Sequence, residues 1–273
     1  MPLFAGIDAG STTAKVVLID GSGAVISRAI RPGGANLAAA AGAALRDALA
    51  AGGAERDDVA GIVATGYGRN AVAEADRAVT EITCHARGIF HLDPMVRGVI
   101  DIGGQDSKAI VLDASGNVVR FEMNDKCAAG TGRFLEVMAR TLEVPLEDMG
   151  RLALESRDPA VISSTCTVFA ESEVVSLAAQ GRAVEDILAG LCRAVAVRAA
   201  GLAGRARIQS PAVMTGGVAR NAAVVAMVAE KLNIPLTVPP EPQFSGALGA
   251  AFFARDTAVP QPQRAGRAQE ISS

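Results

Sequence analysis

The sequence predicts an α/β protein made of two similar lobes that face each other across a cleft, and an internal repeat is the main reason. Residues 6–20 (GIDAGSTTAKVVLID) and 99–113 (VIDIGGQDSKAIVLD) align at a constant offset of 93. Each copy has a short β-rich run, a glycine turn and a second β-rich run, which is typical of a hairpin. Two unrelated hairpins that share turn chemistry are the alternative explanation. The alignment pairs identical residues of the two copies: Asp8 with Asp101, Gly10 with Gly103, Lys15 with Lys108 and Asp20 with Asp113.

The segments after each copy contain further helical and strand patterns. An alanine-rich run that stops at a Gly-Gly pair predicts the first helix, and apolar spacing of helical period predicts the later ones. Short apolar runs that end in glycine turns predict the strands. The predicted elements, in chain order, are a helix at 36–52, a strand at 59–65, a helix from about 134, a long helix at 183–203, a strand at 212–214, a helix at about 221–232 and a last helix from about 244 to 254.

These elements divide the chain into two lobes and a tail. We expect a first lobe at 1–94, which contains the first hairpin, and a second lobe at 95–244, which contains the second. The last helix, at about 245–256, is expected to pack back onto the first lobe. Residues 258–273 are rich in Pro, Gln and charged residues, which predicts a disordered tail.

The composition favours a globular protein and excludes several function classes. Hydrophobic residues make up 50% of the chain and aromatic residues only 3%, so we expect a core of small, closely packed side chains. The net charge of −3 and the pI near 5.5 argue against a nucleic-acid binder or a binder of anionic membranes. The N-terminus lacks a signal-peptide pattern, no run of about 18 apolar residues occurs, and the four cysteines are widely separated. We therefore expect a cytoplasmic protein.

Three glycine turns predict a site for a nucleoside triphosphate, although the chain has no Walker A sequence. Glycine lets the backbone N–H groups of both Asp-x-Gly hairpins approach phosphate oxygens from opposite sides. Asp8 and Asp101, at the strand ends, are expected to hold Mg²⁺ through its water shell. The sequence VMTGGVARN (213–221) predicts a strand, a Gly-Gly turn and a helix start, which suits a flat base or a ribose. Purely structural turns are the alternative.

Two of the cysteines lie in polar turns before predicted helices, which favours metal ligands. Cys127 lies in MNDKCAAGTG and Cys166 in ISSTCTVFAE, where a helix N-terminus favours the thiolate. Two thiolates per chain cannot complete a four-thiolate site, but a twofold dimer can, with either a [4Fe–4S] cluster or zinc. Buried, unreactive cysteines are the alternative. Cys192 falls in a helical apolar pattern and is expected in the core, and the pair Cys84-His85 is expected to be structural.

The order of these motifs resembles the superfamily of actin, heat-shock chaperones, and sugar and acetate kinases. The resemblance rests on two Asp-x-Gly hairpins in register, followed by a strand, TGG and a helix. It implies two lobes of ribonuclease-H-like topology, with ATP in the cleft between them and hinge closure driven by the γ-phosphate. It does not separate a kinase, a chaperone, a filament or an energy-coupling ATPase, because fold does not determine function.

Longer motifs resemble the activators of 2-hydroxyacyl-CoA dehydratases, a family that also contains the ATPase subunits of benzoyl-CoA reductases. The resemblance implies a homodimer that holds one [4Fe–4S] cluster through Cys127 and Cys166. ATP hydrolysis would drive one low-potential electron, supplied by reduced ferredoxin or flavodoxin, into a separate dehydratase, in an oxygen-sensitive reaction. The regular GGQD and CAAGTGRF favour the dehydratase branch. The matching motifs span the chain: ATGYGRN (64–70), TEITCHARG (80–88), DIGGQDSK (101–108), MNDKCAAGTGRFLEV (123–137), SSTCTVFAESEV (163–174), TGGVARN (215–221) and FSGALGAA (244–251).

On this interpretation the chain hydrolyses ATP and does no chemistry on the acyl-CoA. Asp8, Asp101 and Gln105 are the expected catalytic residues, which orient water and hold the Mg²⁺ shell. Lys15 and Lys108 are expected either to contact phosphate or to point into solvent. The residues expected to bind the nucleotide come from the glycine turns and their flanks: Gly10, Ser11, Thr12, Thr13, Lys15, Gly103, Gly104, Asp106, Lys108, Gly130, Gly132, Thr215, Gly216, Gly217, Val218, Asn221 and Gly246.

Two rival functions remain open at this stage. A small-molecule kinase needs a carboxylate base beside the γ-phosphate, for which Asp101 or Asp106 is available, but it leaves the paired cysteines unexplained. A non-catalytic ATP-dependent switch would use those cysteines to bind zinc. Glu171 and Glu173 are expected either to face the cleft or to cap the helix after Cys166.

Overall fold

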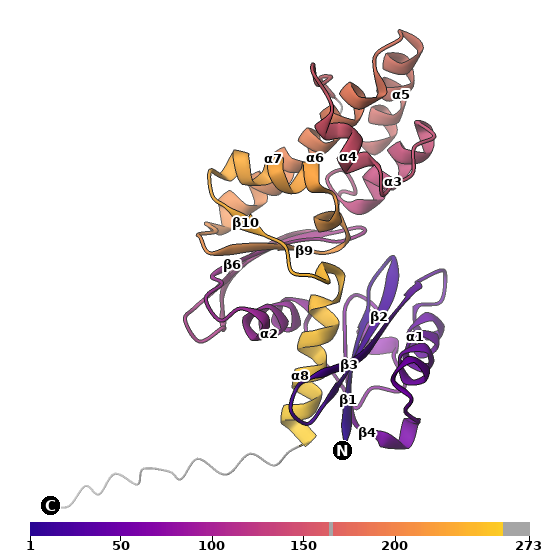
Figure 1. Ribbon diagram of the computed structural model, residues 1–273, viewed down its shortest axis with the longest axis vertical. Helices are drawn as coiled ribbons and strands as arrows, with labels where there is room; N and C mark the ends of the chain where they lie inside the picture. The colour runs from indigo at the N-terminus through magenta and orange to yellow at the C-terminus, as the bar shows by residue number, and fades with distance from the viewer. Residues whose placement is uncertain (164–165, 259–273) are drawn as a thin grey trace, which may run out of the picture.

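The computed structural model describes residues 1–163 and 166–258, which form two five-stranded sheets (Figure 1). The first sheet contains β1 (Leu3–Ala9), β2 (Thr13–Asp20), β3 (Val25–Pro32), β4 (Val59–Thr65) and β5 (Arg77–Ala78). Its order is β3-β2-β1-β4-β5. The hairpin strands β1, β2 and β3 pair antiparallel, whereas β4 runs parallel to β1, and β5 parallel to β4.

The second sheet repeats this topology. It contains β6 (Gly98–Ile102), β7 (Ser107–Leu112), β8 (Val118–Asn124), β9 (Ala212–Thr215) and β10 (Leu236–Thr237), in the order β10-β9-β6-β7-β8. Each hairpin pairs its aspartate with its lysine across the strands, Asp8 with Lys15 and Asp101 with Lys108. The predicted α/β fold of two ribonuclease-H-like lobes is therefore confirmed.

The structural repeat also includes a turn that the sequence comparison did not align. Thr65 ends β4 beside the β1 aspartate, and Thr215 ends β9 beside the β6 aspartate. A glycine with positive φ follows each threonine, with φ of 86° at Gly66 and 83° at Gly216. Glycine takes this conformation without steric cost, so both lobes turn sharply at the same place in the sheet.

Helices cover the outer faces of the sheets. Helix α1 (Leu37–Gly52) packs on the first sheet through Ala41, Ala44 and Ala48, whose small side chains are fully buried. Over the second sheet lie α6 (Val184–Ala206) and α7 (Ala222–Leu232), and α3 (Gly132–Thr141), α4 (Met149–Leu154) and α5 (Thr167–Ala179) extend beyond it at the top of Figure 1. Short 3-10 helices are η1 (Arg56–Asp58), η2 (Arg69–Ala71), η3 (Gly217–Arg220) and η4 (Pro242–Phe244).

Helix α6 is long and apolar enough to cross a membrane by length and composition alone. However, 61% of its most apolar window is buried inside the structure. Ile187, Leu191 and Val195 lie in the main hydrophobic core of the second lobe. This burial is typical of the core helix of a soluble protein. The observed helix ends at Ala206, beyond the predicted end at 203.

Helices α2 (Glu81–Leu92) and α8 (Ser245–Ala258) are exchanged between the lobes. Although α2 follows the first sheet in the chain, its Ala86 and Ile89 share a hydrophobic core with β6, β7 and β9 of the second sheet. Helix α8 follows the second sheet and packs on the first. The two helices are in backbone contact, because a Cβ atom on Gly249 would lie 1.8 Å from the Cys84 carbonyl oxygen. A change in the angle between the lobes therefore changes how α2 and α8 cross.

The exchange affects where the expected lobe boundaries fall in space. The division at residues 94 and 244 stays a prediction, and α2, which precedes residue 94, packs on the second sheet. Helix α8 is longer than expected and ends at Ala258, where the predicted tail begins. Residues 259–273 of that tail lie outside the described residues.

Candidate functional site

A cleft of about 630 Å³ opens between the two lobes. Its volume falls in the range of about 300–1,000 Å³ that is usual for small-molecule sites. Most residues predicted for the nucleotide site line it, together with residues of α2, α3 and the α3–α4 connection. The lining residues are Asp8, Thr12, Thr13, Lys15, Glu81, His85, Asp101, Gly103, Gly104, Gly132, Leu135, Glu136, Leu146, Glu147, Gly216, Gly217, Val218, Arg220, Asn221 and Gln243.

The tips of the two hairpins meet at this cleft, where a glycine is required. A Cβ atom on Gly104 would lie 2.0 Å from the hydroxyl oxygen of Thr12, so any side chain there would push the hairpins apart. The N-terminus of α3 abuts the same turn, because the N–H groups of Gly132 and Arg133 donate to the carbonyl oxygens of Gly103 and Gly104, each at 2.8 Å. The Thr12 hydroxyl is buried and has no hydrogen-bond partner in the described part of the chain. A phosphate oxygen would supply the missing partner.

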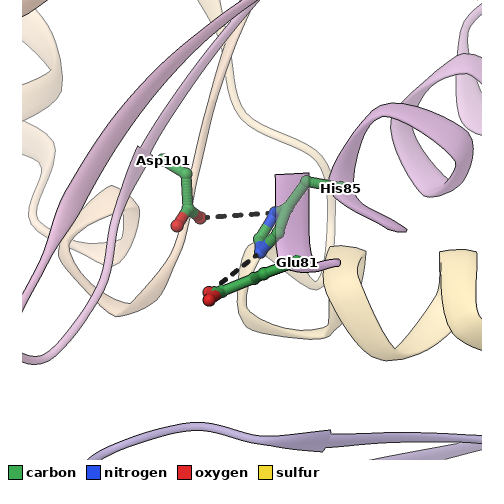
Figure 2. A group of neighbouring side chains, drawn as sticks. All are labelled: Glu81, His85 and Asp101. Carbon is green, nitrogen blue, oxygen red and sulfur yellow. Dashed lines mark ion pairs between the residues drawn. The ribbon is translucent and has the colours of Figure 1, made fainter. Parts of the chain in front are cut away.

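Two residues of α2 that were not predicted as site residues, Glu81 and His85, face the cleft (Figure 2). They are four residues apart and so lie on one face of the helix, and this spacing is the signal that would have found them. His85 is 3% exposed; its Nδ1 lies 3.5 Å from Asp101 Oδ1 and its Nε2 lies 3.7 Å from Glu81 Oε1. Burial lowers the pKa of His85, but the two carboxylates outweigh it and raise the pKa above its ordinary value.

The neighbouring Cys84 behaves differently from His85. Its side chain is buried, and burial raises the pKa of its thiol to about 12. The thiol therefore stays neutral, as a packing role requires. Cys84 and His85 were both expected to be structural. Cys84 fits this expectation, whereas His85 faces the cleft and two carboxylates that line it.

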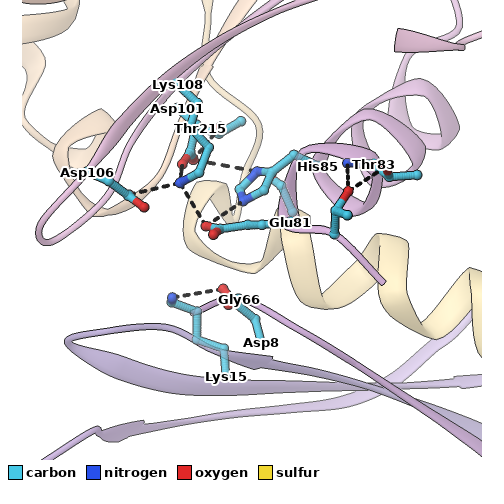
Figure 3. A network of polar contacts seen from close by, with 12 residues as sticks. Asp8, Lys15, Gly66, Glu81, Thr83, His85, Asp101, Asp106, Lys108 and Thr215 are labelled. Atoms are coloured by element: carbon cyan, nitrogen blue, oxygen red, sulfur yellow. Dashed lines mark hydrogen bonds and ion pairs between the residues drawn. The ribbon is translucent and has the colours of Figure 1, made fainter. Parts of the chain in front are cut away.

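Lys108 lies at the centre of a buried ionic network beside the cleft (Figure 3). Its Nζ lies 2.8 Å from Asp106 Oδ1, 2.9 Å from Glu81 Oε1 and 3.5 Å from Asp101 Oδ2, and its side chain is 1% exposed. Burial favours the neutral amine, but the three carboxylates outweigh it and raise the pKa of Lys108. Lys108 therefore does not point into solvent; it compensates the charge of these acids.

The same network holds the two acids of the cleft wall in the ionised form. Burial alone would raise the pKa of Glu81 and of Asp101, but His85 and Lys108 lower both below their ordinary values. The Thr215 hydroxyl donates a further hydrogen bond of 2.8 Å to Asp101 Oδ1. Both side chains are thus fixed acceptors at the cleft.

A second ion pair lies across the cleft from this network (Figure 3). Lys15 Nζ lies 3.1 Å from Asp8 Oδ2, and Asp8 is 3% exposed. Burial lowers the pKa of Lys15, but Asp8 outweighs it, so the pKa is raised. The other carboxylate oxygen, Asp8 Oδ1, is buried and has no hydrogen-bond partner among the described residues. An unpaired carboxylate oxygen of this kind needs a cation or a water as its partner.

The charge balance around the cleft favours a divalent cation. Negative groups outnumber positive ones even when His85 is protonated, so an anionic nucleotide alone would be repelled. Mg²⁺ prefers oxygen ligands and keeps several of its waters, so the unpaired Asp8 oxygen and the fixed Asp101 carboxylate fit a hydrated ion. Six carboxylates stand against three cationic side chains: Asp8, Glu81, Asp101, Asp106, Glu136 and Glu147 against Lys15, Lys108 and Arg220.

The Gly-Gly turn after β9 forms another wall of the cleft. Gly217 and Val218 line it, and the apolar residues Leu135 and Leu146 line the same cleft. Asn221 also lines it, but its Oδ1 is already used: it accepts a 3.0 Å hydrogen bond from the Val224 N–H and so caps α7. A wall of bare backbone and apolar side chains suits a flat base.

The other predicted site residues support the cleft wall or lie beside it. Gln105 is exposed at the tip of the second hairpin, and Gly130 packs under Arg198. Their binding and catalytic roles stay predictions. Predicted residues outside the lining are Gly10, Ser11, Gln105, Asp106, Lys108, Gly130, Thr215 and Gly246.

The two cysteines predicted to be ligands lie on exposed turns of the second lobe. Cys127 follows β8, where Asn124 Nδ2 donates to its carbonyl oxygen at 3.2 Å. Cys166 is the residue directly before α5. Both thiols are exposed and free, whereas Cys192 is buried, and burial raises the pKa of the Cys192 thiol to about 12. Exposure therefore separates the two candidate ligands from the two other cysteines.

Glu171 and Glu173, the two acids of FAESE, do not line the cleft. Glu171 accepts a hydrogen bond of 3.1 Å from the Thr141 hydroxyl of α3. Glu173 accepts two hydrogen bonds of 2.9 Å from Ser163, one from its N–H and one from its hydroxyl. Glu173 thus holds Ser163, which is three residues before Cys166 in the chain.

Comparison with known proteins identifies the family. The sequence model of the BadF/BadG/BcrA/BcrD ATPase family matches residues 5–254. The chain belongs to this family. It is 49% identical over 254 residues to the activator of lactoyl-CoA dehydratase from Anaerotignum propionicum, a match that covers 93% of this chain and 97% of that protein. It is 31% identical over 263 residues to one of the subunits of benzoyl-CoA reductase from Thauera aromatica, over 93% of each chain.

A solved structure agrees with the sequence relatives. The activator of the 2-hydroxyisocaproyl-CoA dehydratase from Clostridium difficile with bound ADPNP has a TM-score of 0.91 to this chain at 42% identity. The match covers 94% of this chain and 95% of the other. The predicted family, the actin-like ATPase fold and the classification as an ATPase are therefore confirmed.

Proposed function

We propose that this chain is the activator of a 2-hydroxyacyl-CoA dehydratase, in which ATP hydrolysis drives one low-potential electron from a [4Fe–4S] cluster into the dehydratase. The short link between the cleft and the cysteine turn is the observation that carries the proposal. The Gly132 N–H donates a hydrogen bond to the carbonyl oxygen of Gly103, in the turn of the second hairpin. Gly132 is only five residues after Cys127. A movement of that turn during nucleotide turnover is therefore passed along this short segment to Cys127.

In the cleft, the glycine turns and the Thr12 hydroxyl would bind phosphate oxygens, and Asp8 and Asp101 would hold hydrated Mg²⁺, whose charge would offset that of the phosphates. Water attacks the γ-phosphorus, the bond to the β–γ bridging oxygen breaks, and ADP and phosphate result. A carboxylate that accepts a hydrogen bond from this water would orient it. Glu81 lines the cleft and Gln105 does not, so the geometry favours Glu81 for that role.

Cys127 and Cys166 are the proposed cluster ligands. Each is an exposed, free thiol, so both are available to a metal centre. A twofold homodimer supplies four thiolates, which is the number that one [4Fe–4S] cluster takes. When bound, the cluster would take one electron from reduced ferredoxin or flavodoxin and give it to the dehydratase. Such an exposed centre would be oxygen-sensitive, so we propose an anaerobic or microaerobic cytoplasm.

Apolar side chains beside Cys166 support a protein contact there. Val168 is 67% exposed and Phe169 is 69% exposed, both in the first turn of α5. Large apolar side chains that cluster on a surface commonly mark a protein interface. The second copy of the chain and the dehydratase are the partners we propose for this surface. The net charge of −3 gives no support to nucleic acid or membrane partners.

The main alternative is the ATPase subunit of a benzoyl-CoA reductase. The 49% identity to a dehydratase activator, against 31% to a component of a benzoyl-CoA reductase, favours the dehydratase branch. A small-molecule kinase could use Asp101 of the cleft as its base, but it would leave the exposed cysteine pair without a role.

The experiment is an iron and sulfide analysis of anaerobically purified protein. We expect about two iron atoms per chain, because two chains would share four. Cys127→Ser and Cys166→Ser should each abolish the iron centre, since one lost ligand per chain removes two of the four. The matched controls, Cys84→Ser and Cys192→Ser, should keep it, because these side chains are buried. Iron that survives in Cys127→Ser or Cys166→Ser would refute the ligand assignment, and zinc in place of iron would support a switch.

A further inference from the structure

His85 lies where the two exchanged helices cross, and groups from both lobes surround it. It belongs to α2, which packs on the second sheet, and it is 3% exposed. From α8, which packs on the first sheet, Gly246 faces the ring. A Cβ atom on Gly246 would lie 3.0 Å from His85 Nε2 and 3.6 Å from Asp8 Oδ2. The imidazole is therefore enclosed between a helix of one lobe and the acid network of the other.

Each ring nitrogen faces a different carboxylate of the cleft (Figure 2). Nδ1 faces Asp101 at 3.5 Å and Nε2 faces Glu81 at 3.7 Å. Each acid also has another partner. The Lys108 ammonium lies 2.9 Å from Glu81, and the Thr215 hydroxyl donates a hydrogen bond of 2.8 Å to Asp101. The ring thus contacts both acids, and so does Lys108 Nζ, which also lies 3.5 Å from Asp101.

The positions of these groups depend on one another. The nearest ligand atoms of Glu81, His85 and Asp101 all lie within 4.8 Å of one another. Two carboxylates so close repel each other, while Lys108 attracts both from one side. Glu81 Oε1 faces both His85 Nε2 and Lys108 Nζ, so without the ring the carboxylate would keep only the ammonium contact and would be free to turn about it. The ring therefore fixes the direction of the Glu81 carboxylate.

We propose that His85 is a positioning residue for ATP hydrolysis, which contacts Glu81 and Asp101 at once and so aims Glu81 at the attacking water. The inference rests on the proposed function, because it assigns that water to the Glu81 carboxylate. Gly246 contacts the ring from the other lobe, so the crossing of α2 and α8 sets where the ring lies. Closure of the lobes over the nucleotide and alignment of Glu81 are then one movement.

The test separates nucleotide binding from the rate of hydrolysis in four variants of the full chain. His85→Ala removes the ring, and His85→Gln keeps a polar side chain that can donate to one of the two acids. Gly246→Ala keeps the histidine, but its added Cβ atom would lie 3.0 Å from His85 Nε2, so the ring must shift by a few tenths of an ångström. Gly204→Ala is the control, because its Cβ atom would meet nothing within 4 Å. For each we would measure the Kd for MgATP, kcat and KM for phosphate release, and the thermal unfolding midpoint.

We expect His85→Ala to lower kcat about tenfold or more with a Kd within about threefold of wild type, because a misplacement near 1 Å can cost about 100-fold in rate. His85→Gln should recover part of that loss, Gly246→Ala should lower kcat about threefold, and Gly204→Ala should match wild type. A kcat of His85→Ala within twofold of wild type would overturn the proposal. So would an equal loss of binding and rate with a lower unfolding midpoint, because it would assign His85 a structural role only. Absence of phosphate release from the wild-type chain would instead overturn the proposed function.

Discussion

Replacing Lys108 with methionine should destabilise the fold by an amount that follows directly from the distances in the structure. Methionine keeps the length and shape of the side chain but removes the ammonium, which lies 2.8 Å from Asp106, 2.9 Å from Glu81 and 3.5 Å from Asp101. At an effective dielectric constant of about 20, each contact near 3 Å is worth about 5 kcal/mol of attraction, most of which desolvation offsets. Removing one partner of such a buried network typically costs about 3–5 kcal/mol, because the remaining charges stay buried without compensation.

The pH dependence of this loss follows from the directions of the pKa shifts. In the wild type, the pKa of Glu81 and of Asp101 lies below the ordinary value, so the stability they contribute is present above pH about 4 and is lost only in stronger acid. In Lys108→Met the ammonium no longer lowers these pKa values, and burial raises them. Protonation then relieves the buried charge, so the difference in stability between variant and wild type should shrink as the pH falls from 7.5 to 5.

The assay is urea unfolding followed by circular dichroism at pH 7.5 and pH 5, with Lys231→Met as the matched control. Lys231 is exposed on α7, so its replacement should change the free energy of unfolding by less than about 0.5 kcal/mol at either pH. A loss below about 1 kcal/mol at pH 7.5, or the same loss at both pH values, would refute the electrostatic argument.

Three further outcomes are expected from the cleft. Asp8→Asn and Asp101→Asn should each lose Mg²⁺-dependent phosphate release while remaining folded. A malachite green assay measures the release, and circular dichroism measures the folding. Full turnover in both variants would refute a nucleotide site between the two hairpins. Gly104→Ala should raise the Kd for MgATP at least tenfold, because its Cβ atom would lie 2.0 Å from Thr12 Oγ1, and unchanged affinity in calorimetry would argue against hairpin contact in the nucleotide-bound form. Label from the γ-phosphate of ATP should appear only as inorganic phosphate when sugars, carboxylates or acyl-CoAs are added, whereas transfer to any of them at the rate of ATP consumption would favour a kinase.

Local spacing was enough to predict the hairpins and much of the cleft. The offset of 93 between the two copies predicted matched hairpins, and both pair an aspartate with a lysine, Asp8 with Lys15 and Asp101 with Lys108. Residues within one hairpin are placed by the strand pairing itself, so their relative positions follow from a few consecutive residues. The turn at Gly216 was also predicted, because the Gly-Gly pair follows a short apolar strand.

Features that depend on packing between distant segments were not predicted. Glu81 and His85 have a readable i, i+4 spacing, but their approach to Asp101 depends on α2 crossing to the second sheet. Lys108 was expected to contact phosphate or solvent. Its ion pair with Glu81 could not be foreseen, because Glu81 comes from a different element. No local pattern reports which sheet a helix will cover, since that choice depends on the whole tertiary fold.

We propose that ATP hydrolysis in the cleft drives an electron out of the chain, and an anaerobic electron-transfer assay measures this coupling. The protein, reduced by dithionite, would be mixed with a 2-hydroxyacyl-CoA dehydratase, and the reduction of the dehydratase would be followed by electron paramagnetic resonance together with phosphate release. We expect reduction with MgATP, almost none with ADPNP, and none with either Cys127→Ser or Asp101→Asn. Equal reduction of the dehydratase with and without MgATP would refute this coupling, because the electron transfer would then need nothing from the cleft.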